Sequence, residues 1–519
     1  MTSTAPTSTA PPTGPPSQVA TAARGTALNL AGAIIGAIVS FGTVGLITNV
    51  YGQAGAGLFF AATAVFTLAA NSARLGAESS LTYFVARYRA DERHGEITGT
   101  IKTALFAAAS VAIALGLAGL ASASWLSGLL TSEASSADTA ATMIRILAIS
   151  VPTFALSQAM FGAARGFGTM RPSVLVGQIG RPISQLIFVL VVIAISDSVW
   201  PLAAAWALSS TVTMVSIGGW LWRRLKLVAE RNSDRTLDQG SARSEGRSTY
   251  WRYTGPRAVS DLLSASLERS DVLLVAVFIG EAGAGLYGAS NRLILAGQLM
   301  MIATAQSMAP LLSANFLKRE HQDAQSVLRT ISGWNVIILW PIFIGLAFGA
   351  KTALSVFGSE FSEASSLVVV LACAFLVIIG LGIGDTLLMM TGDSVASLIN
   401  HAISLAIMVG AAIALLPTVG IVGAAWAWAM SRVALRALSV GRVWYTTRVH
   451  AFGPQVITAM AITVGAYVPT GIAVRLTLGE SVQAVAVHAI VGVVIQLPLL
   501  LRFRERLQLD QLVTVIARR

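Results

Sequence analysis

Residues 52–59 read GQAGAGLF, and residues 280–287 read GEAGAGLY. Two nearly identical octapeptides, 228 positions apart, indicate that the chain contains an internal duplication. Other pairs follow in the same order with small gaps: AES (77–79) with AQS (305–307), LSGLLTSE (126–133) with LSVFGSE (354–360), and AAWA at 204–207 and 424–427. The glycines of the octapeptide favour a tight turn and a close approach of helices.

The composition predicts an all-α polytopic membrane protein. Of 519 residues, 55% are hydrophobic and only 11% are charged, and the mean hydropathy is +0.72. Soluble domains carry about 25% charged residues. Apolar runs such as 27–47, and 183–195 at the core of another, indicate spans across about 30 Å of hydrocarbon. Segments of about ten strictly alternating residues, typical of membrane β-barrels, are absent from the sequence.

The apolar pattern predicts about 14 transmembrane helices. Their cores are 27–50, 54–76, 99–129, 138–163, 172–196, 200–222, 257–279, 283–314, 330–357, 364–390, 394–416, 419–440, 453–474 and 481–501. Arginine and lysine concentrate in every second loop, whereas the other loops, such as 131–138 and 358–363, are short and acidic or neutral. The positive-inside rule then predicts a multi-pass protein of the cell (plasma) membrane with both termini in the cytoplasm. The same distribution explains the net charge of +11 without nucleic acid.

The duplication divides the helices into two parallel, pseudo-symmetric six-helix lobes, because a unit of six helices begins and ends on the same side. Such lobes suit alternating access around a central cavity, although a duplicated structural scaffold is an alternative. The predicted organisation is a disordered cytoplasmic tail (1–24), an N-lobe (25–222), a basic cytoplasmic linker (223–255), a C-lobe (256–446), a C-terminal helix pair (447–502) and a cytoplasmic tail (503–519).

Several stretches resemble one family of membrane transporters. They are ERSDVLLVAVFIGEAGAGLY (268–287), Pro341 followed by FGSEFSEASSLVVVLA (357–372), and GIVGAAWA (420–427). Together they are similar to the polysaccharide-flippase branch of the multidrug/oligosaccharidyl-lipid/polysaccharide exporter superfamily. The resemblance implies twelve to fourteen helices in two six-helix lobes, and a lipid-linked saccharide with a diphosphate head group as the substrate class.

Ionisable residues inside the predicted spans mark candidate sites, because a charge in hydrocarbon costs roughly 3 kcal/mol unless it faces protein or water. Asp261, Ser264, Glu268 and Asp271 are spaced 3, 4 and 3 residues apart, which predicts one helical face. The candidates for the substrate cavity are Arg74, Glu78, Arg145, Arg181, Arg269, Asn291 and Arg292. The candidates for ion coupling are Asp261, Glu268, Asp271 and Asp385, which follows GLGIG (380–384), a run that could bend.

For each charge, an internal salt bridge or a side chain that snorkels to the interface is the alternative. We expect that alternative for Arg165, Arg171, Asp393 and Arg436, and for the Arg74–Glu78 pair both interpretations remain open. Arginines in a cavity suit a diphosphate, since guanidinium binds phosphate through two parallel hydrogen bonds.

These observations predict a transporter that flips a polyprenyl-diphosphate-linked saccharide to the outer leaflet. An ion-coupled multidrug exporter, or a flippase for a peptidoglycan lipid, is the alternative. An enzyme is not expected, because no Ser/His/Asp grouping or nucleotide-binding loop is evident. No cofactor or metal is expected, since Cys373 is the single cysteine and the five histidines are scattered; H⁺ or Na⁺ is the candidate coupling ion. The expected partners are the lipid-linked saccharide and membrane lipids, for a monomer whose association with polysaccharide-assembly enzymes is left open.

Overall fold

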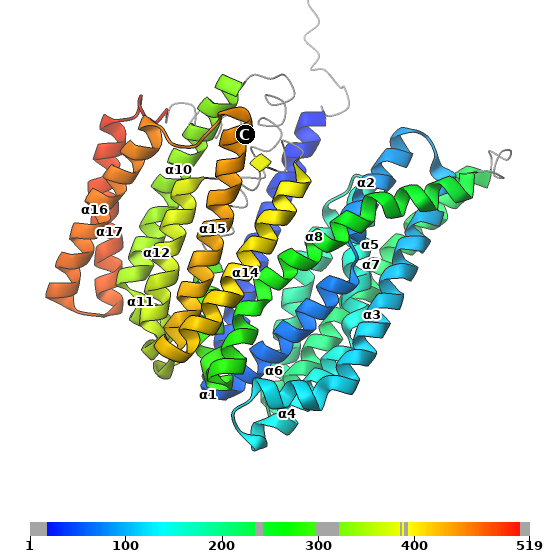
Figure 1. Cartoon of the computed structure of the whole chain (residues 1–519), viewed down its shortest axis with the longest axis horizontal. Helices are drawn as coiled ribbons and strands as arrows, with labels where there is room; N and C mark the ends of the chain where they lie inside the picture. Colours follow the sequence, from blue (N-terminus) through cyan, green and yellow to red (C-terminus); the bar gives the residue numbers. More distant parts are fainter. Residues whose placement is uncertain are drawn as a thin grey trace, which may run out of the picture.

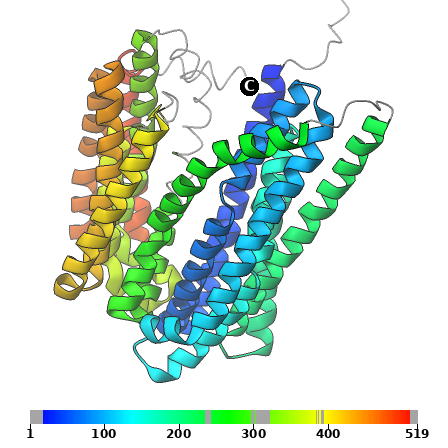
Figure 2. The ribbon, with the colours of Figure 1, turned by 45° about the vertical axis from the view of Figure 1, so that its right-hand side comes forward.

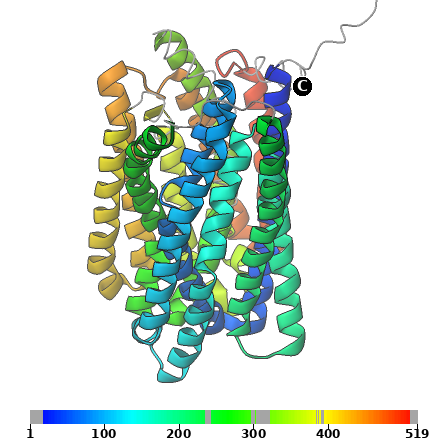
Figure 3. The same ribbon diagram turned by 90° about the vertical axis from the view of Figure 1, so that its right-hand side faces the viewer.

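The computed structural model describes residues 18–233, 242–295, 301, 321–382, 384, 387–388 and 393–508. In this part of the chain, every regular element is a helix (Figure 1). The helices run roughly parallel to one another in two perpendicular views (Figure 1 and Figure 3), as expected for elements that cross one apolar layer.

The first helix, α1 (Gln18–Ala73), contains two limbs joined at Gly52. That glycine has φ 66° and ψ −171°, a conformation that is unfavourable for residues with a side chain. A straight helix of 56 residues would measure about 84 Å, far more than a bilayer needs. Instead α1 descends and turns back at its lower end in Figure 1, so that its limbs correspond to the spans expected at 27–50 and 54–76. Because α1 begins at Gln18, the last residues of the predicted tail 1–24 are helical; residues 1–17 lie outside the described part.

The other helices of the N-terminal half overlap the remaining expected spans, except α2, which lies between the spans expected at 54–76 and 99–129. They are α2 (Ala77–Ala90), α3 (His94–Leu130), α4 (Ala134–Ile149), α5 (Val151–Gly166), the π-helical η1 (Ser173–Gly180), α6 (Arg181–Ile195) and α7 (Pro201–Ser233). Helices α4 and α5 are bent by 42° relative to each other at Ser150 and are apolar enough to cross a membrane only when taken together.

The C-terminal half begins with α8 (Ala242–Ile279) and a helix over residues 281–295. The elements that follow are α10 (His321–Phe348), α11 (Ala350–Leu354), the short 3₁₀ turns η2 (Ser355–Phe357) and η3 (Ser359–Ala364), α12 (Ser365–Leu381), α14 (Ser394–Val419), α15 (Ile421–Thr447), α16 (Pro454–Leu478) and α17 (Val482–Arg502). The run GLGIG ends α12, since Gly382 has φ 84°. Asp385 and most of the eighth expected span lie outside the described residues.

The basic segment 223–255 is largely helical, because α7 continues to Ser233 and α8 already begins at Ala242; residues 234–241 are outside the described part.

Among the described residues, nine helices are long and apolar enough to cross a membrane, or ten if the bent pair α4 and α5 counts as one span. One of the nine, Leu28–Ala90, includes both limbs of α1, and α8 and α15 are not among them. The expected count of 14 spans, and the two pseudo-symmetric lobes, therefore remain predictions.

The helices gather into two groups in Figure 2. Those up to residue 233 lie on one side, and those from residue 321 onward lie on the other, with α8 running obliquely between them. The groups meet at the lower end of the picture, which we call the distal end because it is opposite the beginning of α1. One buried cluster joins the groups there and includes Ile47, Phe59, Tyr287, Phe357 and Phe361. The cavity described below lies away from this contact.

Candidate functional site

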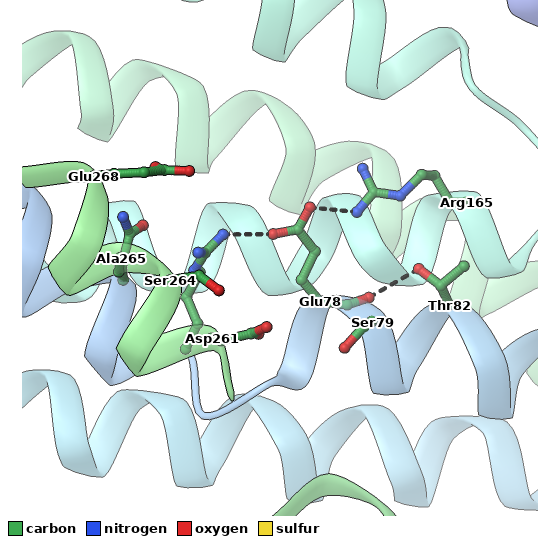
Figure 4. A pocket seen from close by; sticks show the side chains of 10 residues that line it. Glu78, Ser79, Thr82, Arg165, Asp261, Ser264, Ala265 and Glu268 are labelled. Carbon is green, nitrogen blue, oxygen red and sulfur yellow. Dashed lines mark hydrogen bonds and ion pairs between the residues drawn. The ribbon is translucent and has the colours of Figure 1, made fainter. Parts of the chain in front are cut away.

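A cavity of about 420 Å³ lies between the end of α1, α2, α5 and α8 (Figure 4). Its walls are polar and charged, and the lining residues are Asn71, Arg74, Glu78, Ser79, Thr82, Arg165, Asp261, Ser264, Ala265 and Glu268. The cavity therefore separates an N-terminal wall from α8, the first helix of the C-terminal half.

A break between α1 and α2 places two of the charged side chains on the N-terminal wall. Leu75 has φ 47° and Gly76 has φ 69°, so the helix ends at Ala73 and begins again at Ala77. Left-handed backbone at a leucine is strained, and irregular backbone at membrane depth is tolerated where it lines a cavity. The break positions Arg74 just before α2 and Glu78 in its first turn, both facing the cavity.

Glu78 is shared by two arginines. Its Oε2 accepts a hydrogen bond of 2.6 Å from Nη1 of Arg74, and its Oε1 accepts one of 2.5 Å from Nη2 of Arg165 (Figure 4). Close packing of α2 on α5 fixes this geometry, because a methyl group built on Gly162 would lie 2.2 Å from the Glu78 carbonyl oxygen. Arg74 and Glu78 thus form an internal pair and also line the cavity, so the two interpretations left open by the sequence both apply.

Arg165 makes the internal salt bridge expected of it, but it also lines the cavity, which the sequence did not predict. The signal that could have found it is its position near the end of an apolar span, at the same predicted level as Glu78 on its neighbour. Asp393 is likewise paired, with Arg442 at 2.8 Å.

The opposite wall is formed by α8. Asp261, Ser264 and Glu268 all line the cavity, in agreement with their spacing (Figure 4). Asp271, expected on the same face, is not part of this lining. It is only 4% exposed, and its carboxylate accepts hydrogen bonds from the Tyr287 hydroxyl (3.0 Å) and the Val272 backbone N–H (2.8 Å). The face predicted from spacing is therefore divided between two environments.

A second group of charges consists of Arg181, Arg269 and Arg292, three arginines from three helices. Arg269 is close enough to both of the others to act on them electrostatically. Among the described residues, none of the three has an ion pair within 4 Å, and the Nε atoms of Arg181 and Arg269 are buried without a hydrogen-bond partner. The Arg181 guanidinium instead lies over the Phe154 ring, 4.3 Å from its centre.

The π-helical turn η1 sets the direction of Arg181. Such turns are rare and shift the side chains that follow them around the helix axis. Here η1 ends at Gly180, directly before Arg181 and Pro182. The register of Arg181 therefore depends on a local deviation from the α-helix that a 3.6-residue period does not predict.

Sequence reasoning missed Arg432 on α15. Its Nη2 donates to the Leu267 carbonyl oxygen (3.1 Å), and its guanidinium lies 5.7 Å from the centre of the Trp428 ring. It is also within electrostatic range of Asp271. Its position in the middle of the expected span 419–440 was the available signal. The arginines that act on Asp271, Arg432 and Arg269, thus come from two helices of the C-terminal half.

Of the seven expected cavity residues, only Arg74 and Glu78 line this cavity; Arg181, Arg269 and Arg292 form the separate group described above, and the remaining two lie elsewhere. Arg145 is exposed on α4 and donates to the Ser124 hydroxyl (2.8 Å), away from the cavity lining. Asn291 is partly buried on the helix over 281–295 and does not line the cavity either. Their positions within the apolar spans correctly predicted that both residues lie in helices. These positions did not predict how each helix is rotated about its axis, and therefore which way the side chain points. Asp385 lies outside the described residues. No group of three His, Cys, Asp or Glu that could hold a metal ion is present in the described ranges.

Comparison with known proteins agrees with this architecture. A family model described as "Polysaccharide biosynthesis protein" matches residues 22–316, more than half of the chain. The "Probable low-salt glycan biosynthesis flippase Agl15" of Haloferax volcanii is 29% identical over 125 residues, which is 24% of this chain and 26% of that relative. The chain thus spans about a quarter of the length of this curated relative.

Two solved structures share the fold. The lipid II flippase MurJ in an inward closed conformation has a TM-score of 0.67 at 12% identity and covers 92% of this chain and 98% of its own. An inward-facing multidrug resistance MATE family transporter of the MOP superfamily has a TM-score of 0.65 at 15% identity and covers 82% of this chain and 98% of its own.

The resemblance stated from the sequence is confirmed by these comparisons, and the many apolar helices are those of a multi-pass membrane protein. By the match over residues 22–316, the chain belongs to the polysaccharide biosynthesis protein family.

Proposed function

We propose that this protein flips a polyprenyl-diphosphate-linked saccharide from the cytoplasmic to the outer leaflet by alternating access. The observation that carries the proposal is the deep group Arg181, Arg269 and Arg292, which has no carboxylate salt bridge in the described part of the chain. The family and the glycan-flippase name of the relative support the same substrate class.

The electrostatics of this group favour a multiply charged anion. Three like charges repel one another, and each buried cation without a partner costs several kcal/mol of desolvation. A diphosphate offers two anionic groups that guanidinium can bind bidentately. Binding therefore relieves repulsion between arginines that come from both halves, which would draw the halves together around the head group.

The cavity of about 420 Å³ supports a role as the entrance for the polar head. It presents Ser79, Thr82 and Ser264, with carboxylates on α8 that can accept hydrogen bonds from saccharide hydroxyls. In this proposal the saccharide occupies the wet cavity, the diphosphate reaches the arginines, and the polyprenyl chain stays in lipid.

Ion coupling is assigned to the carboxylates of α8. Glu268 is exposed toward the cavity, whereas Asp271 is buried beside Tyr287 and Arg432. We propose that H⁺ or Na⁺ binds one of them, or Asp261, in one conformation and leaves in the other. If Glu268 or Asp271 binds the ion, a Glu268→Gln, Asp271→Asn double variant loses its dependence on the ion gradient; unchanged gradient-driven flipping by that variant excludes these two residues and leaves Asp261.

A second candidate is an ion-coupled multidrug exporter, or a flippase for a peptidoglycan lipid. The excess of three carboxylates over two arginines in the cavity favours the drug exporter, because it attracts a cation. The fold is shared with a MATE transporter and with the lipid II flippase MurJ. A drug exporter should change drug susceptibility when deleted, whereas a saccharide flippase should not.

The decisive experiment is deletion followed by lipid analysis. We expect a lipid-linked saccharide to accumulate on the cytoplasmic leaflet, and wild-type protein to clear it. Arg269→Gln should restore less than about a tenth of the activity, since a charge-assisted contact of about 1.5–3 kcal/mol is lost. The matched control is Arg145→Gln, an exposed arginine outside the site, which should restore flipping fully. If no lipid intermediate accumulates, the flippase proposal is wrong.

In the same proposal the protein is a non-enzymatic monomer of the plasma membrane with both termini in the cytoplasm. Its distal end then faces outward, and its partners are the lipid-linked substrate and the surrounding lipids.

A further inference from the structure

The two copies of the repeated octapeptide lie against each other at the distal end. A methyl group built on Gly57 would place its carbon 1.6 Å from the Glu281 carbonyl oxygen. A methyl group built on Gly285 would lie 2.1 Å from the Gln53 carbonyl oxygen. Gly57 and Gly285 are equivalent positions of the repeat, as are Gln53 and Glu281, so each copy presents its glycine to the same carbonyl of the other.

This contact admits only glycine. Atoms closer than about 3 Å to a Cβ force the backbone to move, and both neighbours here are backbone atoms rather than flexible side chains. Elsewhere on the same helix, Gly45 has no atom within 4 Å of the corresponding position. The glycines of the repeat are thus required by a contact between the copies, in addition to the turns at Gly52 (φ 66°) and Gly280 (φ 90°).

The variable second residue of each octapeptide bonds a turn of the opposite half. In the first copy, the Gln53 backbone N–H donates to Oε1 of Glu360 (2.8 Å), and its side-chain amide donates to the Glu360 carbonyl oxygen (2.9 Å). In the second copy, Oε2 of Glu281 accepts from the Ser132 backbone N–H (2.8 Å) and hydroxyl (2.9 Å). Ser132 and Glu360 belong to the matched turns TSE (131–133) and GSE (358–360).

The hydrogen bonds across the interface have a consistent polarity. The C-terminal half supplies both carboxylates, Glu281 and Glu360, and the N-terminal half supplies the N–H and O–H donors. The Asn49 side chain adds another donor, to the Val356 carbonyl oxygen at 2.9 Å. A hydrogen bond to a carboxylate is stronger than a hydrogen bond between two uncharged groups. A few such bonds can therefore keep the two halves together across a small interface.

We propose that the duplicated octapeptide forms the outer gate of this transporter. The gate closes by direct backbone contact of its two copies and is latched by Glu281 and Glu360. The proposal rests on the alternating-access function above. Because the contact between the copies is made by glycines, no side chains interlock at Gly57 and Gly285, and the copies can part there. The apolar cluster that joins the halves beside this contact must separate in the same step.

Access to the cavity from each face tests the gate directly. In a Cys373→Ser background, a Ser264→Cys reporter lines the cavity, and a membrane-impermeant maleimide is added to one face of proteoliposomes at a time. Labelling from the outer face should be low with the wild-type gate. Gly57→Ala or Gly285→Ala should raise it about fivefold or more, because an added methyl group prevents closure.

Two further variants separate gating from a folding defect. Gly45→Ala adds the same methyl group to α1 where there is space and should leave labelling unchanged. Glu281→Gln keeps the size of the side chain but removes the charge, and it should also raise outer labelling. Each variant is first checked for a monodisperse, folded elution profile in detergent.

The proposal is overturned if folded Gly57→Ala, Gly285→Ala and Glu281→Gln proteins all label like the wild type from the outer face. Since no substrate is present, this result is independent of the substrate assignment. Lipid analysis of the deletion strain can therefore refute the flippase proposal while the labelling experiment confirms the gate. The labelling experiment can likewise refute the gate while lipid analysis confirms flipping.

Discussion

At the scale of single residues, Glu78 is the charge on which the N-terminal wall of the cavity depends, because it bonds both Arg74 and Arg165. We predict that Glu78→Gln lowers the free energy of unfolding by about 1–2 kcal/mol, since two partly buried guanidinium groups lose their shared carboxylate partner. Thermal unfolding in detergent measures this effect. Glu133→Gln, an exposed carboxylate, is the matched control and should change stability by less than about 0.5 kcal/mol. Equal melting temperatures for the two variants would contradict the structural role of Glu78.

Glu281, the first residue of the helix over 281–295 and outside the candidate spans, gives a prediction about stability in acid. Burial alone would raise its pKa, but hydrogen bonds from the Ser132 backbone and hydroxyl and from Ser136 outweigh burial and hold the pKa below the ordinary 4.5. Its bonds therefore stabilise the closed end fully above pH 4.5, and this contribution is lost as the pH falls through the lowered pKa. We expect the melting temperature of the wild type to fall in this acidic range more steeply than that of Glu281→Gln. Parallel pH profiles would show that Glu281 is not part of a latch.

At the scale of elements, the bend of α1 at Gly52 determines whether one long apolar segment becomes two spans. Left-handed backbone at an L-residue costs about 1–2 kcal/mol, and the same substitution within a regular helix gains about 0.5–1 kcal/mol. We therefore predict that Gly52→Ala destabilises the protein, whereas Gly45→Ala is neutral or stabilising. Chemical denaturation of both variants checks the prediction, and a Gly52→Ala protein as stable as Gly45→Ala would contradict it.

The oblique helix α8 connects the two halves as an element. Its N-terminal part packs on α2, where Tyr83 and Tyr253 stack at 4.6 Å, and further along it packs on α14. Glu268 and Asp271 lie on this same helix, one exposed and one buried. A change in the tilt of α8 would thus alter the cavity and the deep arginines together.

At the scale of the whole molecule, the structure is closed at the distal end and holds the charged cavity away from that end. We predict that linking the halves there stops transport. In the Cys373→Ser background, Ser132→Cys with Glu281→Cys places two thiols where the native side chains are 2.9 Å apart. A short cleavable crosslinker should abolish flipping, and its reduction should restore it. Transport that continues after complete crosslinking would exclude alternating opening of the distal end.

Several properties of this protein follow from its sequence alone. Composition and apolar run length are one-dimensional quantities, and they determined a helical membrane protein with charges at particular depths. The internal match of the two octapeptides showed a duplication, and their glycines predicted turns, which Gly52 and Gly280 adopt. The spacing of Asp261, Ser264 and Glu268 correctly predicted one shared face, because a regular helix repeats every 3.6 residues.

The tertiary structure decided which of these groups meet. Rotation by one residue turns a side chain about 100° around its helix, so Arg165 and Arg432 belong to the charged groups while Arg145 does not. The break at Leu75 and the π-turn before Arg181 change this rotation locally, and no periodicity reveals either of them. The contact of Gly57 with Glu281 joins residues that are far apart in the chain. Only the packing of one half against the other brings the two copies of the repeat together.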